Sequence, residues 1–176
     1  MLPHRVNESI TLRILQNHHS EALFALTDRN RAHLREWLPW LDETTTIEHS
    51  REFIRSALKA FTESAVFAAG IWHRDVFCGV IAYNFIDWEK RIAYPGYWLS
   101  EDHQGLGIIT ECCRALIRHA FEEYQLNQII IHVATGNSRS QAIPERLGFR
   151  QEGIKPQAEW LYDHHVDHSI NVLHRP

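Results

Sequence analysis

Residues 92–124 constrain the fold of this chain more than any other stretch, because a strand-like run, a loop with two glycines and a helical run follow one another there. Gly105 and Gly107 have no Cβ atom, so backbone N–H groups beside them can approach a ligand closely. The helix that begins after the loop adds its own unbonded N–H groups and the positive end of its dipole. The stretch therefore predicts an anion-binding loop between a strand and a helix, and a pyrophosphate would fit it.

The loop fits one type of phosphate-binding motif better than two others. A Walker loop needs Gly-Lys-Ser/Thr, which is absent. A Rossmann fingerprint needs a third glycine, where Thr110 stands, and an acid at a strand end about twenty residues on. Glu122 and Glu123 close the helix instead. A coenzyme A pyrophosphate loop of the form Gln-x-x-Gly-x-Gly/Ala remains, and so does a plain strand–helix turn that needs glycine.

Hydrophobic periodicity divides the chain into strands and helices. Alternation over residues 10–15 predicts a strand, and Ser20 is a suitable N-cap for a helix that ends before Pro39. Pro95-Gly96 interrupts the strand over residues 92–99 and indicates a bulge or an edge position. We expect the other strands at residues 66–72, 77–86, 129–133, 149–160 and 166–173, and the other helices at residues 45–61, 108–124 and 138–147. The order β-α-α-β-β-β-α-β-α-β-β predicts an α/β or α+β fold in one domain, residues 1–176, around one mixed sheet.

Composition sets the class of protein. Hydrophobic residues make up 44% of the 176 residues, which is enough for one sizeable core. The formal net charge of −4 excludes a basic nucleic-acid-binding domain. The three cysteines include the neighbours Cys112 and Cys113, a poor disulfide framework that indicates reduced thiols. No signal-peptide pattern and no apolar run of about 20 residues is visible, so we expect a cytoplasmic protein that binds neither nucleic acid nor a membrane.

Six motifs in order resemble one protein family along nearly the whole chain. They are Trp37-Leu38-Pro39-Trp40, Gly96-Tyr97-Trp98-Leu99, Gln104-Gly105-Leu106-Gly107-Ile108, Asn137-x-x-Ser140, Leu147-Gly148-Phe149-x-x-Glu152-Gly153 and Gln157-Ala158-Glu159-Trp160-Leu161. On these residues the chain resembles the GNAT superfamily of acetyl-CoA-dependent N-acetyltransferases and, within it, the ribosomal-protein-serine/alanine N-acetyltransferase group. The set is specific for fold and cofactor, and less so for substrate, because many relatives share these motifs and act on other amines.

The resemblance implies a GNAT fold, a twisted mixed sheet flanked by helices, whose fourth and fifth strands splay apart to admit acetyl-CoA. The strand Tyr97-Trp98-Leu99 would hydrogen-bond the pantetheine arm, and the loop would hold the pyrophosphate. Ile109 departs from the family pattern, which has Gly or Ala there, and Leu106 stands where relatives often carry Lys. The implied acetyl-CoA-binding residues are Trp98, Leu99, His103, Gln104, Gly105, Leu106, Gly107, Ile108, Ile109, Thr110, Asn137 and Ser140.

The resemblance also implies catalytic residues. Glu159, which follows Gln-Ala in the family pattern, would accept a proton from the amine, directly or through water, with a solvated strand glutamate as the alternative. Ser140 would donate a hydrogen bond or a proton to the CoA sulfur, and Asn137 would bind the pantetheine or orient the loop. The alternatives are helix capping for Asn137 and a place on the helix surface for Ser140. A backbone N–H near Leu99 would stabilise the oxyanion.

Tryptophans and histidines supply further candidates. The tryptophans predicted to line the acceptor side, with core packing as the alternative, are Trp37, Trp40 and Trp88. The chain holds 13 histidines, most of them scattered. The one group that looks like a metal cluster is His164, His165 and His168, with Asp163 and Asp167. A polar hairpin is the simpler interpretation of that group, and we predict no metal.

The resemblance implies an enzyme that transfers the acetyl group of acetyl-CoA to a primary amine by direct attack in a ternary complex. A small-molecule amine (polyamine, antibiotic or amino acid) is an alternative acceptor, and a non-catalytic acetyl-CoA-binding module is an alternative function. A homodimer or a higher homo-oligomer is left open. The acceptor that the resemblance implies is the N-terminal α-amine of a protein, with ribosomal proteins as the expected class.

Overall fold

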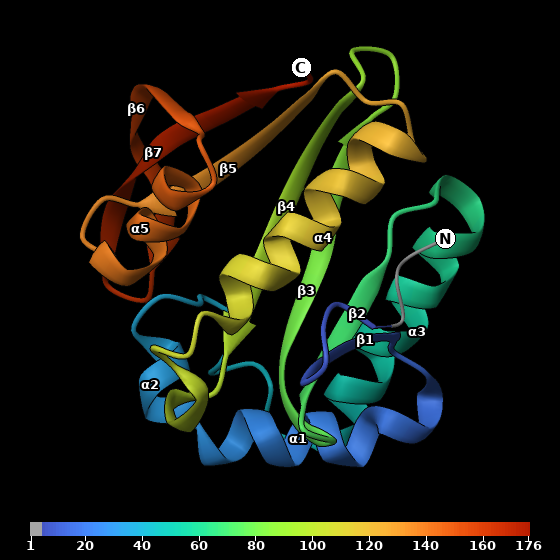
Figure 1. Cartoon of the computed structure of the whole chain (residues 1–176). Coiled ribbons are helices and arrows are strands. Elements are labelled where there is room, and N and C mark those ends of the chain that lie inside the picture. The colour runs from blue at the N-terminus through green and yellow to red at the C-terminus, as the bar shows by residue number, and fades with distance from the viewer. Residues whose placement is uncertain (1–4) are drawn as a thin grey trace.

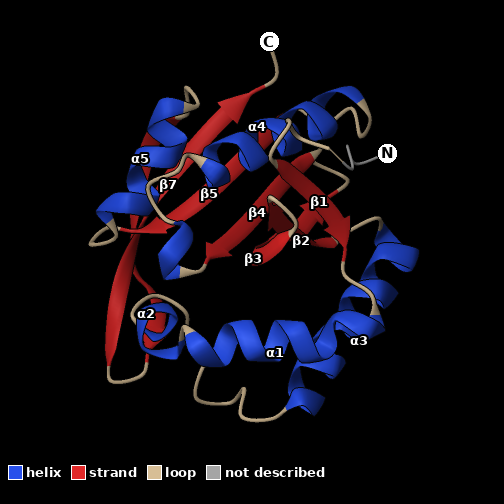
Figure 2. Ribbon diagram, turned by 60° about the horizontal axis from the view of Figure 1, so that its bottom comes forward, coloured by secondary structure: helices blue, strands red, loops and turns tan. Residues whose placement is uncertain are grey.

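The computed structural model describes residues 5–176 and shows one seven-stranded sheet flanked by helices (Figures 1 and 2). The strand order is β1-β2-β3-β4-β5-β7-β6, which confirms the predicted fold around one mixed sheet. The strands are β1 (Ile10–Ile14), β2 (Ala68–His73), β3 (Val76–Asp87), β4 (Ile92–Leu99), β5 (Gln128–Ala134), β6 (Arg150–Leu161) and β7 (His164–His174). The helices are η1 (Asn17–His19), α1 (Ser20–Arg29), α2 (Arg31–Arg35), α3 (Ile47–Ser64), η2 (Glu101–His103), α4 (Ile108–Glu122) and α5 (Ser138–Arg146).

The single helix predicted between Ser20 and Pro39 is two helices, α1 and α2, that meet at Asn30. Asn30 leaves the helical conformation, with φ −108° and ψ 14°. Its side-chain amide donates to the Leu26 carbonyl at 2.9 Å and its Oδ1 accepts the Glu101 N–H at 3.0 Å. Ser20 is the first residue of α1 and not its N-cap. The break therefore ties the start of the α2 segment to the loop after β4.

The sheet splits between its two parallel neighbours, β4 and β5. β4 pairs with β5 only at Ile92 and Ala93, whereas β3 pairs with β4 along its length and β5 pairs with β7 along its length. In Figure 1 the two strands meet near the top of the molecule and diverge downwards. Beyond Ala93 the facing edges of β4 and β5 are therefore open, as the family resemblance implied.

A bulge accompanies the split, but it lies on β3 and not at Pro95 itself. The register shifts between Tyr83 and Phe85, which pair with Pro95 and Tyr94, so Asn84 is the extra residue. The Tyr83 N–H donates to the Phe67 carbonyl on the β2 side, so Tyr83 and Pro95 are a non-hydrogen-bonded pair, and the missing N–H of the proline costs the β3–β4 ladder no hydrogen bond. A Cβ on Gly96 would lie 2.3 Å from Asn84 Nδ2, so a larger residue there would require the Asn84 side chain to move.

Helices cover both faces of the sheet (Figure 2), and each face has its own apolar cluster. On one face α4 packs its buried Cys112, Cys113, Leu116 and Ala120 against the central strands. On the other face α1 and α3 contribute Leu23 and Ile54 to a second cluster.

Burial raises the pKa of Cys112 to about 12, so this thiol packs as an apolar group and is not a nucleophile. No helix of the described residues is long and apolar enough to cross a membrane.

His119 is a buried titratable group, 4% exposed. Its Nδ1 lies 3.2 Å from the Tyr83 hydroxyl, its ring packs on Phe67 and Tyr124, and its Nε2 lies 3.8 Å from the carboxylate of Glu123. Burial lowers the pKa of His119 to about 4, below the 6.5 of an exposed histidine. The folded protein therefore holds this imidazole neutral at pH values where the unfolded chain would protonate it.

Acid should destabilise the protein through His119. As pH falls from 7 to 5 the unfolded state takes up the proton first, so the free energy of unfolding should drop by about 2 kcal/mol from this group alone. His119→Gln should remove that part of the pH dependence, whereas His174→Gln at an exposed histidine should not. Urea unfolding at pH 7, 6 and 5 measures the effect, and an unchanged slope in His119→Gln would refute it.

Candidate functional site

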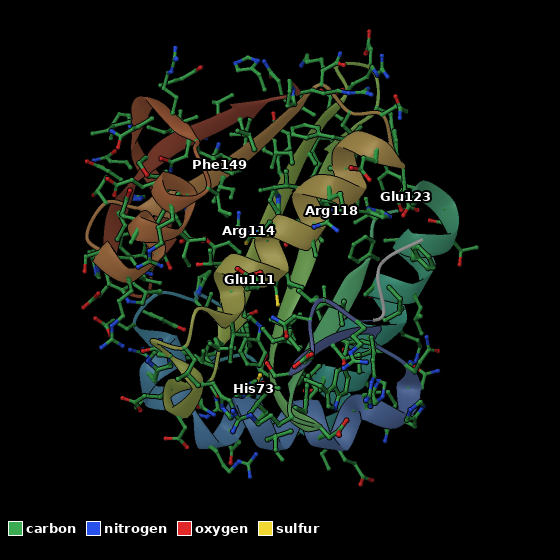
Figure 3. All side chains as sticks on the ribbon, viewed as in Figure 1. His73, Glu111, Arg114, Arg118, Glu123 and Phe149 are labelled. Atoms are coloured by element: carbon green, nitrogen blue, oxygen red, sulfur yellow. The ribbon has the colours of Figure 1, made fainter. Side chains whose placement is uncertain are left out.

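A deep cleft opens where β4 and β5 separate. Its volume is about 2190 Å³, larger than the roughly 300–1,000 Å³ of a typical small-molecule pocket. It is lined by the loop before α4 and the start of that helix, by β4, β5 and α5, by residues of α1 and α3, and by the segment after α2 with parts of β6 and β7. Figure 3 labels Glu111 in the first turn of α4, at the end of the helix nearest this opening. The cleft therefore has room for two substrates at once.

The loop before α4 is built to receive an anion. Gly105 and Gly107 have φ of 75° and 72°, a left-handed conformation that glycine adopts without strain, and a Cβ on either would meet nothing within 4 Å. Gly107 is the N-cap of α4 and supplies no side-chain cap, so the first N–H groups of the helix keep no partner from a cap. Ile109, which stands where the family pattern has Gly or Ala, is 8% exposed and packs in the core. Its larger side chain therefore does not cover the backbone of the loop.

Two arginines that the sequence analysis missed face this loop from α5. Arg139 donates to the side-chain oxygen of Gln104, and Arg146 Nη1 lies 3.5 Å from Thr110 Oγ1. Both line the cleft, and a spacing of seven residues puts them on one face of α5. The Gln104 amide also donates to His33 Nε2 at 2.9 Å. The arginines supply positive charge beside a loop whose Leu106 carries none.

The free edge of β4 presents backbone groups to the cleft. The Ser100 N–H donates to the Cys78 carbonyl at 2.8 Å, so by the alternation of an antiparallel ladder Trp98 also directs its backbone toward β3. The backbone groups of Tyr97 and Leu99 point the other way, toward the open edge. The indole of Trp98 packs near Trp40, with 6.3 Å between ring centroids. Tyr97 and Leu99, and not Trp98, are therefore the backbone donors and acceptors available to an extended ligand.

Asn137 and Ser140 lie at the start of α5. The Asn137 side chain accepts the Ser140 N–H at 3.2 Å, which is the helix-capping alternative named above. Both residues line the cleft. Within residues 5–176 the Ser140 hydroxyl forms no hydrogen bond, and the bond to Asn137 is made by the backbone N–H of this residue. Gln141 fixes the helix in place, since it donates to the Ala134 carbonyl at 3.2 Å and accepts from the buried Ser169 hydroxyl at 3.0 Å.

Glu159 lies in the cleft because β6 bulges just before it. Lys155 pairs with His168 and Glu159 pairs with Val166, so four steps along β6 match two along β7. Gln157 turns this corner with φ 47°, and its N–H donates to Asp167 Oδ1 at 2.8 Å. Bulges of this kind redirect the side chains that follow them. The Glu159 carboxylate is 31% exposed and faces His168 at 3.4 Å.

Of the three predicted tryptophans, Trp37 and Trp40 line the cleft and Trp88 does not. Trp37 reaches the loop after β5, where a Cβ on Gly136 would lie 3.3 Å from the indole. Trp88 lies beyond the far end of β3, donates to the Ser64 carbonyl at 3.1 Å and packs on Tyr124. The prediction for Trp88 is therefore corrected: its indole covers the end of α3.

The hairpin of β6 and β7 holds the segment of Trp37 and Trp40 in position. The Tyr162 hydroxyl at its tip donates to the Leu38 carbonyl at 2.5 Å and accepts the Leu41 N–H at 3.2 Å. Arg35 stacks on the Tyr162 ring at 3.7 Å. Tyr162 therefore anchors the segment of Trp37 and Trp40 to the hairpin of β6 and β7.

The remaining predicted residues also have defined places. His103 lines the cleft, with Nδ1 2.8 Å from the Ser100 hydroxyl, and its ring packs edge-on against His73, which Figure 3 labels. His164, His165 and His168 have three separate partners, Asp163, Trp160 and Glu159. Within residues 5–176 no group of His, Cys, Asp and Glu has the arrangement of a metal site. The predicted coenzyme residues that line the cleft are Trp98, Leu99, His103, Gln104, Gly105, Leu106, Gly107, Ile108, Ile109, Thr110, Asn137 and Ser140.

Comparison with known proteins gives one consistent result. Residues 9–150 match the family described as acetyltransferase (GNAT) domain. YdaF of Bacillus subtilis (strain 168) is 35% identical over 164 residues, covering 93% of this chain and 90% of YdaF. The ribosomal-protein-serine acetyltransferase of Escherichia coli (strain K12) is 31% identical over 171 residues, covering 97% and 94% of the two chains.

Solved structures agree in fold. The RimL ribosomal L7/L12 alpha-N-protein acetyltransferase in complex with coenzyme A superposes with a TM-score of 0.93 at 27% identity, covering 97% of each chain. The microcin C7 self-immunity acetyltransferase MccE, in complex with acetyl-CoA and AMP, has a TM-score of 0.92 at 27% identity, covering 97% of this chain and 94% of MccE. Both structures therefore share the fold of this chain over nearly its whole length.

Proposed function

This chain belongs to the GNAT acetyltransferase family and is an acetyl-CoA-dependent N-acetyltransferase, and on that premise we propose that it acetylates the N-terminal α-amine of a protein, with ribosomal proteins as the acceptor class. The observation that carries the proposal is one cleft lined by the anion loop, Ser140 and Glu159 together. The 31% identity to a ribosomal-protein-serine acetyltransferase supports the choice of acceptor.

The cleft fits acetyl-CoA along its length. The N–H groups at the start of α4, with Arg139 and Arg146, would hold the phosphates, and the open edge of β4 at Tyr97 and Leu99 would hold the pantetheine amides. The two glycines leave the space that a diphosphate needs, since a Cβ on either would meet nothing within 4 Å. When bound, acetyl-CoA supplies an acetyl group activated as a thioester.

Glu159 acts as the general base. An α-amino group has a pKa of roughly 7.7–8.0, so at neutral pH much of it is protonated and cannot attack a carbonyl carbon. The carboxylate of Glu159 accepts the proton, directly or through one water, on the acceptor side of the cleft. Its 31% exposure lets it return the proton to solvent.

Backbone and hydroxyl donors complete the site. The Leu99 N–H, on the open edge of β4, donates to the carbonyl oxygen as negative charge develops there. The Ser140 hydroxyl, free of a partner within the described residues, donates to the departing sulfur. A thiol pKa near 8.5 makes that sulfur a fair leaving group even without a strong acid. Trp37 and Trp40 wall the space in which the acceptor peptide lies.

Removing the α5 arginines should weaken coenzyme binding and leave the chemistry intact. Arg139→Ala and Arg146→Ala should each raise the KM for acetyl-CoA roughly three- to tenfold with little change in kcat, because a charge-assisted contact near solvent is worth about 1 kcal/mol. Added salt screens the charge of the arginines, so it should reduce the difference in KM for acetyl-CoA between each variant and wild type. Arg150→Ala, an exposed β6 arginine outside the cleft lining, is the matched control. Equal KM values in all four proteins would contradict this assignment.

A thiol-release assay tests the acceptor. The enzyme with acetyl-CoA is given peptides that begin with Ser or Ala, the same peptides with a blocked N-terminus, and polyamines. Turnover with the free peptides and with no other acceptor supports the proposal. Turnover with polyamines or with blocked peptides contradicts it. The likeness to MccE, whose structure holds acetyl-CoA and AMP, makes a small-molecule amine the second candidate.

A further inference from the structure

His168 of β7 faces Glu159 of β6 inside the cleft. Nε2 of His168 lies 3.4 Å from Oε2 of Glu159, and the two side chains are 16% and 31% exposed. They are not direct partners in the strand register, in which Glu159 pairs with Val166 and His168 pairs with Lys155. The bulge at Gln157, anchored on Asp167, brings them together. The proximity is thus a product of the same irregularity that turns Glu159 into the cleft.

The groups around His168 leave few charges beside this pair. On β5, His132 lies with its ring centroid 6.2 Å from that of His168, and Tyr94 of β4 lies 6.1 Å beyond. On β6 the neighbours are Glu159 and Lys155. Burial, and then the nearby His168 and Lys155, lower the pKa of His132, so His132 is neutral at neutral pH. The charges that face His168 are therefore the Glu159 carboxylate and the Lys155 ammonium group.

We propose that His168 is a positioning residue for Glu159: its imidazole donates the Nε2–H to Oε2 and leaves Oε1 free to take the proton of the acceptor amine. The inference rests on the proposed role of Glu159 as base. In the step itself the proton leaves the ammonium nitrogen and binds Oε1, the nitrogen keeps its electron pair for attack, and His168 keeps its own proton.

A second histidine–glutamate pair between the same strands provides a matched control. His174 Nε2 lies 3.6 Å from Glu152 Oε1, with side chains 61% and 46% exposed, and neither residue lines the cleft. The two pairs share chemistry and strands and differ in burial and in the presence of the cleft. A surface pair of this kind contributes little to stability and has no substrate to act on.

The test measures kcat and the KM for acetyl-CoA from pH 5.5 to 8.5 in wild type, His168→Gln, His168→Ala and His174→Gln. Glutamine keeps an N–H donor, so kcat of His168→Gln should stay close to wild type across this range. Alanine removes the donor, so kcat should fall about tenfold at pH 8, the usual effect of one lost charge-assisted hydrogen bond. The KM for acetyl-CoA should not change, and His174→Gln should match wild type throughout.

Two further results separate this inference from the assignment of the base. If Glu159→Gln is inactive while both His168 variants keep the wild-type rate and pH profile, the base stands and the role of His168 is refuted. If Glu159→Gln keeps wild-type activity, the base itself is wrong, and His168 has no carboxylate to position. Glu159→Gln/His168→Ala should be no slower than Glu159→Gln alone; an additive loss would show that His168 acts by another route and would overturn the proposal.

Discussion

Glu159→Gln should lower kcat by roughly two to four orders of magnitude, the range that loss of a general base usually gives. Glutamine keeps the shape of the side chain and its place after the β6 bulge, but its amide cannot accept the proton of an ammonium group. The anion loop and the edge of β4 lie elsewhere in the cleft, so the affinity for acetyl-CoA should be unchanged. The expected result is therefore a binding-competent enzyme without turnover.

Steady-state kinetics over pH 6 to 9, with calorimetric titration of acetyl-CoA, would measure both quantities. The residual activity of the variant should rise steeply at alkaline pH, where the acceptor amine is already neutral. Glu152→Gln is the matched control, because Glu152 lies on the same strand, faces a histidine in the same way and lies outside the cleft lining. A variant with the pH–rate profile of wild type would retire Glu159 as the base.

The parts of the site that were predictable lie in contiguous sequence. The anion loop could be recognised from Gly105 and Gly107, because a left-handed backbone conformation beside a helix start favours glycine. The structure shows both residues at positive φ. The order of the strands follows from hydrophobic periodicity, but the break between α1 and α2 at Asn30 does not. The split of β4 from β5 could not be predicted from periodicity, because a strand has the same sequence pattern whether it pairs along two residues or eight. Only the resemblance to known acetyltransferases indicated the split.

The parts that were not predictable depend on the register between distant segments. Arg139 and Arg146 look like ordinary surface residues of a short helix until the topology places α5 opposite the anion loop. The bulge at Gln157 exists only relative to β7, whose Asp167 accepts the Gln157 N–H. Trp88 shows the converse, because an indole on the end of a helix has the same sequence signature as one in a cleft.

The net charge of −4 is reconciled with an anionic coenzyme by the same geometry. Backbone N–H groups carry no formal charge, so a loop and a helix start can hold phosphates in a mildly acidic protein. The arginines of α5 add charge only where the phosphates lie, and Leu106, 59% exposed, adds none. Binding should therefore depend more on the shape of the loop than on the total charge of the protein.

Gly105→Ala/Gly107→Ala should consequently raise the KM for acetyl-CoA by about 100-fold, because hydrogen bonds to a charged group are each worth roughly 1.5–3 kcal/mol. Each added Cβ projects into space that the structure leaves open, which is where the phosphates would lie, and each φ is one that alanine adopts only with strain. Binding is measured by titration of coenzyme A, and stability by thermal unfolding.

Strain alone would produce a different result, and Gly148 distinguishes the two causes. Gly148 follows α5 with φ 80°, a Cβ there would also meet nothing within 4 Å, and the residue does not line the cleft. Gly148→Ala should therefore lose about as much stability as either single loop variant, roughly 1 kcal/mol, and keep the wild-type KM. If Gly148→Ala raised the KM as far as the loop variants did, the effect would come from strain in the fold. If the loop variants bound coenzyme A normally, the phosphates would have to be held elsewhere, and the arginines of α5 would be the remaining candidates.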